Sequence, residues 1–243
     1  MAVKIIYLDR VGSTNKHISG LLDKGPQPDH FMLVADYQEA GKGQGANQWH
    51  SKHGKNLLAS LLLYPAFLSA SDQFYLSRMA SLALIDSLGD LKLSASIKWP
   101  NDILVRQKKV AGILIENTIS GKHIAHTIIG IGLNLNQLKF PDFPLNASSL
   151  ALETGRQFDR NEMAETLLEA LMRRYRELEN GELGTLRNDY LEHLYLLNEA
   201  GEFLSGDEQF TGIIRGLNEP GELIVERNGT NHHYAFQEIK YLI

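Results

Sequence analysis

Five consecutive residues carry an unusual density of chemistry: a cation, an indole, a rigid ring, an amide and a carboxylate stand in a row at Lys98, Trp99, Pro100, Asn101 and Asp102. Proline fixes its own φ and pushes the residue before it out of the helical region, so this stretch predicts a loop that holds its polar groups in a fixed array. Its lysine could bind a phosphate, and its aspartate a metal ion or a neighbouring cation. An ordinary turn that buries the indole and caps the next element is equally consistent with the residues.

A glycine-rich segment lies earlier, between Gln38 and Trp49, with glycines alternating at Gly41, Gly43 and Gly45. Alternating glycines let a backbone approach a ligand closely and point N–H groups at an anion. The segment matches neither a dinucleotide fingerprint, which needs a helix to open at the glycines, nor a Walker loop, which ends in Gly-Lys-Ser/Thr. A mobile surface loop and a loop that closes over a ligand both remain open. The indole favours the second, because it can cover a flat ligand.

A third feature ends an apolar strand, where Gly130 and Gly132 stand two residues apart. Side chains alternate along a strand, so the two glycines leave a groove on one face. A ligand, a crossing backbone or a packed side chain could fill that groove. Asn134 lies on the same face and could read the edge of a base.

The histidines predict no metal site. His50 and His53 are three residues apart, but no carboxylate or third ligand accompanies them at useful spacing. His232 and His233 would point to opposite faces of a strand.

Apolar patterning predicts the elements that must position these groups. Strands are expected near residues 3–8, 31–37, 56–64, 95–98, 103–106, 110–118 and 123–134. Helical spacing covers residues 14–23, 71–88, 160–180 and 183–196. The run Ser13-Thr14-Asn15 is typical of a helix start, and such residues can also donate hydrogen bonds to a ligand carbonyl. Asp159 with Glu162 three residues later is a capping signature for the third helix.

Composition bounds the class of protein. At 243 residues, 43% hydrophobic and 22% charged, the chain can bury a substantial core. A net charge of −5 disfavours a nucleic-acid-coating role, and the absence of cysteine excludes disulfides and thiolate chemistry. No apolar run is long enough to span a bilayer, and the N-terminal residues do not resemble a secretory signal, so a cytoplasmic protein without a membrane partner is expected.

The sequence pattern changes after Gly201, from helical spacing to short strand-like runs. Short strand-like runs at 202–205, 208–215, 222–227 and 232–236 are separated by Gly206-Asp207, Asn218-Glu219-Pro220-Gly221 and Asn228-Gly229, which are hairpin signals. We expect a main domain over residues 1–197 and a small all-β unit of about 45 residues over 198–243, too small to be very stable unless it packs on the main domain.

Taken in order along almost the whole chain, these motifs resemble the biotin protein ligases, which attach biotin to carboxylase carrier proteins. The resemblance rests on Ser13-Thr14-Asn15, the glycine-rich loop, Lys98 to Asp102 with Lys109 downstream, and the Gly130–Asn134 strand end. It implies a mixed α/β (α+β) fold, with a sheet flanked by helices as in class II aminoacyl-tRNA synthetases and a C-terminal SH3-like β-barrel. It also implies two reactions: biotin and ATP give biotinyl-5′-AMP and pyrophosphate, and a lysine of a biotin carboxyl carrier protein then displaces AMP.

The resemblance implies a role for each motif. Lys98, Asp102 and Lys109 would be catalytic. Lys109 would contact the biotin carboxyl and α-phosphate oxygens, and Asp102 would place Mg²⁺ or orient the incoming lysine. Lys98 would shape the nucleotide side of the site. Biotin would contact Ser13, Thr14, Asn15, Gln38, Gly41, Lys42, Gly112, Leu114, Gly130 and Gly132. The nucleotide would contact Lys42, Gly43, Gln44, Trp49, Asn101 and Asn134. Of these, Trp49 and Asn134 would contact the adenine. Trp99 is then interpreted as a packing anchor for its neighbours.

The chain departs from the family at its glycine-rich loop, where relatives usually place several arginines and this chain has Lys42, Gln44 and Asn47. Since Gln44 supplies no guanidinium, we expect this loop to bind biotinyl-AMP less tightly than an arginine-rich loop does.

The Ser-Thr-Asn motif starts at residue 13, so an N-terminal DNA-binding domain and its repressor function are not expected. A homodimer is possible by family analogy. The alternatives are a lipoate ligase or octanoyltransferase, a non-catalytic biotin or nucleotide sensor, and a DNA-binding regulator.

Overall fold

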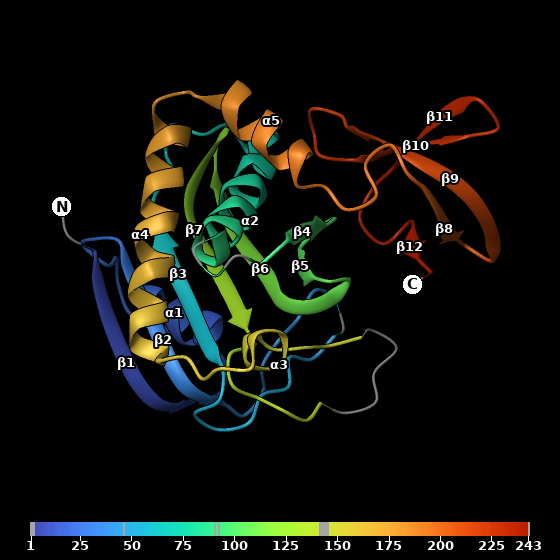
Figure 1. Ribbon diagram of the computed structural model, residues 1–243. Helices are drawn as coiled ribbons and strands as arrows, with labels where there is room; N and C mark the ends of the chain where they lie inside the picture. The colour runs from blue at the N-terminus through green and yellow to red at the C-terminus, as the bar shows by residue number, and fades with distance from the viewer. Residues whose placement is uncertain (1–2, 46, 90, 92, 141–145, 243) are drawn as a thin grey trace.

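The computed structural model describes residues 3–45, 47–89, 91, 93–140 and 146–242. A seven-stranded sheet runs in the order β1-β2-β3-β7-β6-β5-β4; β1 and β2 are parallel, and the other neighbouring pairs are antiparallel (Figure 1). Its strands are β1 (Lys4–Val11), β2 (Phe31–Gln38), β3 (Leu57–Leu63), β4 (Ala95–Lys98), β5 (Asp102–Val105), β6 (Lys108–Ser120) and β7 (His123–Leu133). The mixed sheet predicted from the sequence is therefore confirmed.

Helices cover both faces of this sheet. They are α1 (Thr14–Leu22), a 3₁₀ turn (Ala70–Asp72), α2 (Phe74–Gly89), α3 (Leu150–Thr154), α4 (Arg160–Glu179) and α5 (Leu183–Glu192). None of them, within the described part of the chain, is both long and apolar enough to cross a membrane.

Strand alternation divides the core. On β2, Met32 and Val34 join the large cluster that α2 and α4 complete, whereas Phe31 and Leu33 point to the other face. There they pack with Ile18 of α1, which is fully buried. Because successive strand residues face opposite sides, a single apolar strand serves both layers, and α1 is fixed against the sheet with its N-terminus at the strand ends.

One predicted helix is shorter than expected. The spacing predicted helix over 183–196, but α5 ends at Glu192. The backbone then pairs with the edge strand β4: Ile97 N–H donates to His193 O, and Tyr195 N–H donates to Ile97 O. The residues that follow the helix therefore form an extended segment along the sheet edge. Helical periodicity alone could not predict this pairing.

The chain beyond α5 forms a second, five-stranded sheet in the order β11-β10-β9-β8-β12 (Figure 1). Its strands are β8 (Ala200–Ser205), β9 (Glu208–Leu217), β10 (Leu223–Arg227), β11 (Thr230–Tyr234) and β12 (Lys240–Tyr241). The three predicted hairpins are present as β8–β9, β9–β10 and β10–β11. Among the described strands β11 and β12 stand at opposite ends of the order, so a closed barrel is not confirmed.

Trp99 joins the two sheets. Its side chain is 2% exposed, its Nε1–H donates to Gly221 O at 2.9 Å, and its ring centroid lies 5.3 Å from that of Phe236. The interpretation of Trp99 as a packing anchor is confirmed, and its partners prove to be turns of the C-terminal sheet.

Replacing Trp99 with phenylalanine should lower the free energy of unfolding by about 1–3 kcal/mol, because it leaves the buried Gly221 carbonyl without its donor. Urea denaturation measures the change. Tyr7→Phe, which alters a half-exposed ring on β1, is the control and should leave the midpoint in place. A urea midpoint of Trp99→Phe equal to that of the unmodified chain would contradict the anchoring role.

Candidate functional site

A pocket of about 340 Å³ opens where β6 and β7 pass the start of α1 and the glycine-rich loop. Most of the residues predicted from the sequence line it together. They are Ser13, Thr14, Asn15, Gln38, Lys42, Gly43, Gln44, Trp49, Asn101, Asp102, Lys109, Gly112, Leu114, Gly130, Gly132 and Asn134. Gly41 lines a second hollow, which shares Gln38 and Trp49 with the first, and Lys98 is not among the described lining residues.

One end of the pocket is a neutral hydrogen-bonding network. Gln38 Oε1 accepts from both the backbone N–H and the hydroxyl of Thr14, at 2.8 and 3.0 Å. Ser60 Oγ lies within hydrogen-bond distance of Thr14 Oγ1, at 2.7 Å, and of Asn15 Oδ1, at 2.6 Å. Ser13 is buried at the start of α1 without a side-chain capping bond to that helix. This end therefore offers donors and acceptors without net charge.

Asn15 fixes the position of α1 over the sheet. Its Nδ2 donates to Glu116 Oε2 at 2.7 Å and to Leu114 O at 3.3 Å. A Cβ on Gly130 would overlap the Asn15 carboxamide, so the glycine is needed for the close approach of the amide. The groove predicted at Gly130 is thus filled by a protein side chain, and any contact of Asn15 with a ligand stays a prediction.

The glycine-rich loop is a small hairpin. Gly43 N–H donates to Asn47 O at 2.8 Å, Trp49 N–H donates to Gly41 O at 2.9 Å, and Lys42 bridges Gln48. Ala46 lies outside the described residues. These bonds turn Trp49 back toward the sheet, as a covering role for the loop requires.

Trp49 covers the second glycine of the strand. A Cβ on Gly132 would overlap the indole, and a Cβ on Gly112 would lie 2.9 Å from its Cζ3. The indole Nε1–H is buried without a hydrogen-bond partner in the described structure. A buried donor without a partner is costly, so it is a position where a ligand acceptor would be stabilising.

The other end of the pocket is charged. Lys109 Nζ contacts Asp102 Oδ1 at 2.6 Å and lies 5.5 Å from the Trp49 ring centroid. Asp102 is 8% exposed and is the one carboxylate among the described lining residues. Asn101 Nδ2 donates to Ile113 O at 2.8 Å, which ties the loop to β6. The first motif is therefore a turn whose Asn101 and Asp102 line the pocket, and binding of a phosphate or a metal ion by this turn stays a prediction.

Lys98 lies behind Asp102, its register partner across the β4–β5 pair. Burial lowers the pKa of the Lys98 ammonium, and the Asp102 carboxylate acts in the opposite direction. Its ammonium lies 5.1 Å from the ring centroid of Tyr241, in the C-terminal sheet.

Asn134 is buried at the end of β7. Its Nδ2 donates to Ser148 O at 2.9 Å, while its Oδ1 is buried without a partner among the described residues. The free acceptor matches the donor edge of an adenine, so the geometry agrees with the predicted contact without testing it.

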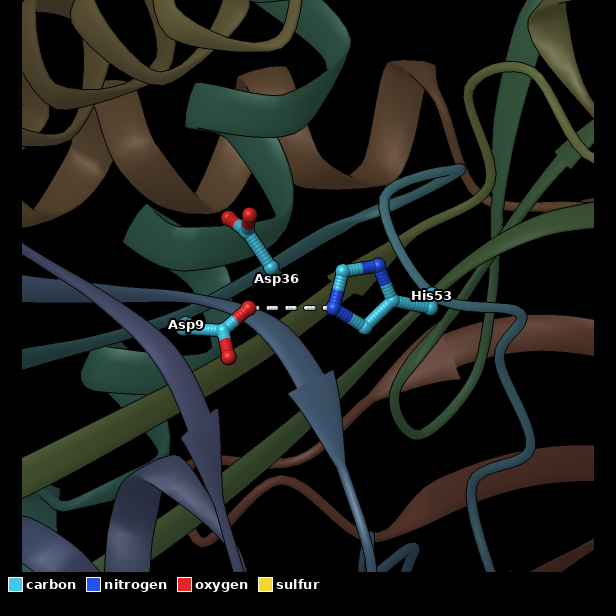
Figure 2. A group of neighbouring side chains, drawn as sticks. All are labelled: Asp9, Asp36 and His53. Atoms are coloured by element: carbon cyan, nitrogen blue, oxygen red, sulfur yellow. Dashed lines mark hydrogen bonds and ion pairs between the residues drawn. The ribbon is translucent and has the colours of Figure 1, made fainter.

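Two carboxylates lie near His53 in space, although none accompanies it at useful spacing in the sequence. His53 Nε2 lies 3.0 Å from Asp9 Oδ1, and Asp36 lies beside this pair (Figure 2). The carboxylates come from β1 and β2, far from His53 in sequence. Asp36 Oδ1 contacts Arg160 Nη2 at 2.6 Å, and in Figure 2 its carboxylate points away from the His53 ring. We therefore interpret the group as ion pairs that hold the segment following the glycine-rich loop.

Several positions of the site were not predicted from the sequence. Ser60 and Glu116 hold the neutral end. Further lining residues are Asn47, Gln48, His50, Ala59, Ile113, Ile131, Phe140 and Ala147. Ser60 carried a usable signal, since it is the single polar residue of the strand Leu57–Leu63. Glu116 carried none by itself, because its partner Asn15 is 101 residues away.

A model of the biotin/lipoate A/B protein ligase family matches residues 7–134, more than half of the chain. The chain belongs to this family. The match covers the neutral end, the glycine-rich loop, the charged turn and the glycine strand, so the described pocket lies almost wholly within the family's shared segment.

Family members that resemble this chain are biotin ligases. The biotin–[acetyl-CoA-carboxylase] ligase of Paracoccus denitrificans is 33% identical over 79% of this chain and 82% of its own length. The bifunctional ligase/repressor BirA of Bacillus subtilis is 32% identical over 94% of this chain and 71% of its own length. The biotin protein ligase of Aquifex aeolicus, solved with biotin and ATP, superposes with a TM-score of 0.82 at 26% identity over 98% of both chains. The predicted assignment to the biotin protein ligases, and so to ligase enzymes, is confirmed.

Proposed function

We propose that this chain joins biotin to ATP, giving biotinyl-5′-AMP and pyrophosphate, and then transfers the biotinyl group to a lysine of a biotin carboxyl carrier protein. One observation carries the proposal: a neutral hydrogen-bonding end and a charged end that holds Lys109 and Asp102 lie in a single pocket, with the strand glycines under Trp49 between them. Biotin is neutral at its ring and anionic at its carboxylate, which matches that gradient.

The neutral end would bind the ureido ring. Thr14 and Gln38 present paired donors and acceptors, and Ser13 and the Gly41–Lys42 backbone complete the set. Gly112, Leu114, Gly130 and Gly132, which line the pocket, would contact the tail. Asn15 supports this surface through its bonds to Glu116 and Leu114.

The charged end would carry the chemistry. A biotin carboxylate oxygen attacks the α-phosphorus, the new O–P bond forms, and pyrophosphate leaves. Both reactants are anionic, so a cation between them must offset their repulsion and stabilise the charge that develops on phosphorus. We assign this role to Lys109, because Asp102 holds its ammonium at the pocket wall. In the second step the carrier amine attacks the carbonyl carbon of the mixed anhydride, and AMP leaves.

The residues fit a magnesium ion that arrives with the nucleotide. Mg²⁺ in such sites takes one or two carboxylates together with substrate phosphates, and Asp102 is the carboxylate that the described lining supplies. Bound there, the ion would neutralise phosphate charge. Asp102 would therefore share its oxygens between the ion and Lys109.

The nucleotide would lie on the loop side of the pocket. Trp49 carries a buried donor and Asn134 a buried acceptor that have no partner among the described residues, and these would suit an adenine. Lys42, Gly43 and Gln44 would contact the phosphates from the hairpin, and Asn101 would hold the turn beside them.

Biotin-dependent exchange of pyrophosphate into ATP tests the proposal. Exchange with biotin supports it. Exchange with lipoate or octanoate instead would identify the alternative branch of the family, and binding of biotin without exchange would identify a sensor.

Replacing Gln44 with arginine should slow release of biotinyl-AMP several-fold, because a guanidinium can bind the phosphate or acyl oxygens and an amide is a weaker partner. Single-turnover formation followed by dilution measures the off-rate. Asn47→Ser, at the same hairpin, is the control. An unchanged off-rate in Gln44→Arg would contradict a loose hold by this loop.

The remaining assignments are proposals too. A cytoplasmic location fits an ATP-dependent enzyme, and a homodimer and an SH3-like topology for the C-terminal sheet follow from the family alone. The division between residues 197 and 198 is likewise a proposal; it would fall between α5, which ends at Glu192, and β8, which begins at Ala200.

A further inference from the structure

Lys98 is a buried cation without an ion pair among the described residues. It is 8% exposed. The carboxylate that faces it across the strand pair, Asp102, is engaged at 2.6 Å by Lys109 instead. A buried charge lacking a counter-ion is expensive, so its environment must contain something that offsets the cost.

The described compensation comes from the C-terminal sheet. The Tyr241 ring centroid lies 5.1 Å from Lys98 Nζ, within the range of a cation–π contact. The ring is itself fixed, because its centroid lies 5.3 Å from that of Phe203 and 6.3 Å from that of Tyr195. Burial raises the pKa of the Tyr241 phenol, so it remains neutral and presents an uncharged π-face to the ammonium.

We propose that Tyr241 is a positioning residue: its ring holds the Lys98 ammonium beside Asp102, ready for the anionic phosphates of a nucleoside triphosphate. This inference rests on the proposed function and adds to it the nucleotide-side role of a residue from the second sheet. Lys98 is the cation of this turn that has no ion pair among the described residues once Lys109 has paired with Asp102, so an arriving phosphate supplies its counter-ion.

The anchoring of the second sheet supports this reading. Trp99, next to Lys98, donates to Gly221 O and packs on Phe236, so the sheet docks directly on the turn that carries the cation. Any shift of β12 relative to β4 would move the ring away from the ammonium. The second sheet therefore acts on the charged end through one side chain rather than through the pocket lining.

The test compares variants of the full chain in biotin-dependent pyrophosphate exchange and in calorimetric binding of ATP. Tyr241→Leu should lower kcat/KM for ATP and weaken ATP binding by about tenfold, the scale of a desolvated cation–π contact, with KM for biotin within twofold. Tyr241→Phe keeps the ring and should retain near-normal values. Tyr241→pentafluorophenylalanine keeps the shape but reverses the charge of the ring face, and should behave like leucine.

A double-mutant cycle separates positioning from general packing. In a Lys98→Met background, Tyr241→Leu should cause no further loss, because the residue through which it acts is gone. Tyr234→Leu, whose ring lies 6.1 Å from that of Phe210 in the same sheet, is the control for loosening the sheet and should leave KM for ATP unchanged.

Three results would overturn the inference: an undiminished loss from Tyr241→Leu in the Lys98→Met background, a pentafluorophenylalanine variant that matches Tyr241→Phe, or a Tyr234→Leu defect equal to that of Tyr241→Leu. These failures are distinct from failure of the proposed function. If the unmodified chain shows no biotin-dependent exchange, the function fails, and ATP binding by the same variants still decides whether Tyr241 acts through Lys98.

Discussion

Lys109→Ala should lower biotin-dependent pyrophosphate exchange by at least about a hundredfold, the scale of losing one preorganised group that stabilises developing charge. The ammonium contacts Asp102 at 2.6 Å and is only 22% exposed, so it is held in place before substrate arrives. Removing it leaves the two anionic reactants without their shared cation and leaves Asp102 without its counter-ion. Initial rates at saturating ATP and biotin measure the loss.

The adjacent lysine supplies a matched control. Lys108 is also in β6, but its side chain is 45% exposed and lies 3.6 Å from Glu153, outside the described lining. Lys108→Ala should keep normal exchange. Lys109→Arg restores charge but not the compact ammonium, and should recover part of the activity. If the exchange rate of Lys109→Ala stays within twofold of that of the unmodified chain, Lys109 takes no part in the reaction. That result would favour the sensor alternative.

The sequence was most informative where local chemistry and strand alternation coincide. Gly130 and Gly132 could be placed on one face because alternation has a period of two, and the structure finds both under close-packed side chains. Trp99 was predicted to be a packing anchor because Trp49 is the better cover for an adenine. For the two glycines, the alternation that decides the prediction lies within a few residues of chain.

Long-range contacts were not predictable in the same way. The Asn15–Glu116 bond joins residues 101 apart, and the Trp99–Gly221 bond joins residues 122 apart. The Asp9–His53 pair depends on where the segment that carries His53 lies relative to β1. Residue spacing within either segment does not determine that position. The early end of α5 has the same origin, since the edge of β4 competes for the backbone that helical propensity would have kept.

The two glycines of the groove separate folding from ligand binding. A Cβ at Gly130 would overlap Asn15, whose carboxamide is held by Glu116, Leu114 and Ser60, so the neighbour has no room to yield. Gly130→Ala should therefore lower the free energy of unfolding by about 1–3 kcal/mol. Its effect on activity would follow from the disturbed α1.

Gly132→Ala should instead leave stability nearly unchanged and weaken biotin and ATP use by about tenfold to a hundredfold. The side chain that a new Cβ would displace is Trp49, which is partly exposed and belongs to the loop hairpin, so we expect the loop rather than the sheet to yield. The indole would then leave the position over Gly112 and Gly132 from which it covers the pocket. Thermal melts and exchange kinetics measured together distinguish the two outcomes.

Gly20→Ala controls for the substitution itself. A Cβ there meets no atom within 4 Å, and the site lies in α1, where alanine favours the helix, so stability should rise slightly and kinetics should not change. Normal KM values for Gly132→Ala would show that the indole does not cover the ligand. A large loss of stability would show that Trp49 is a structural residue instead. The predicted separation depends on one physical difference: Asn15 is fixed by three partners, whereas the Trp49 Nε1–H has none among the described residues.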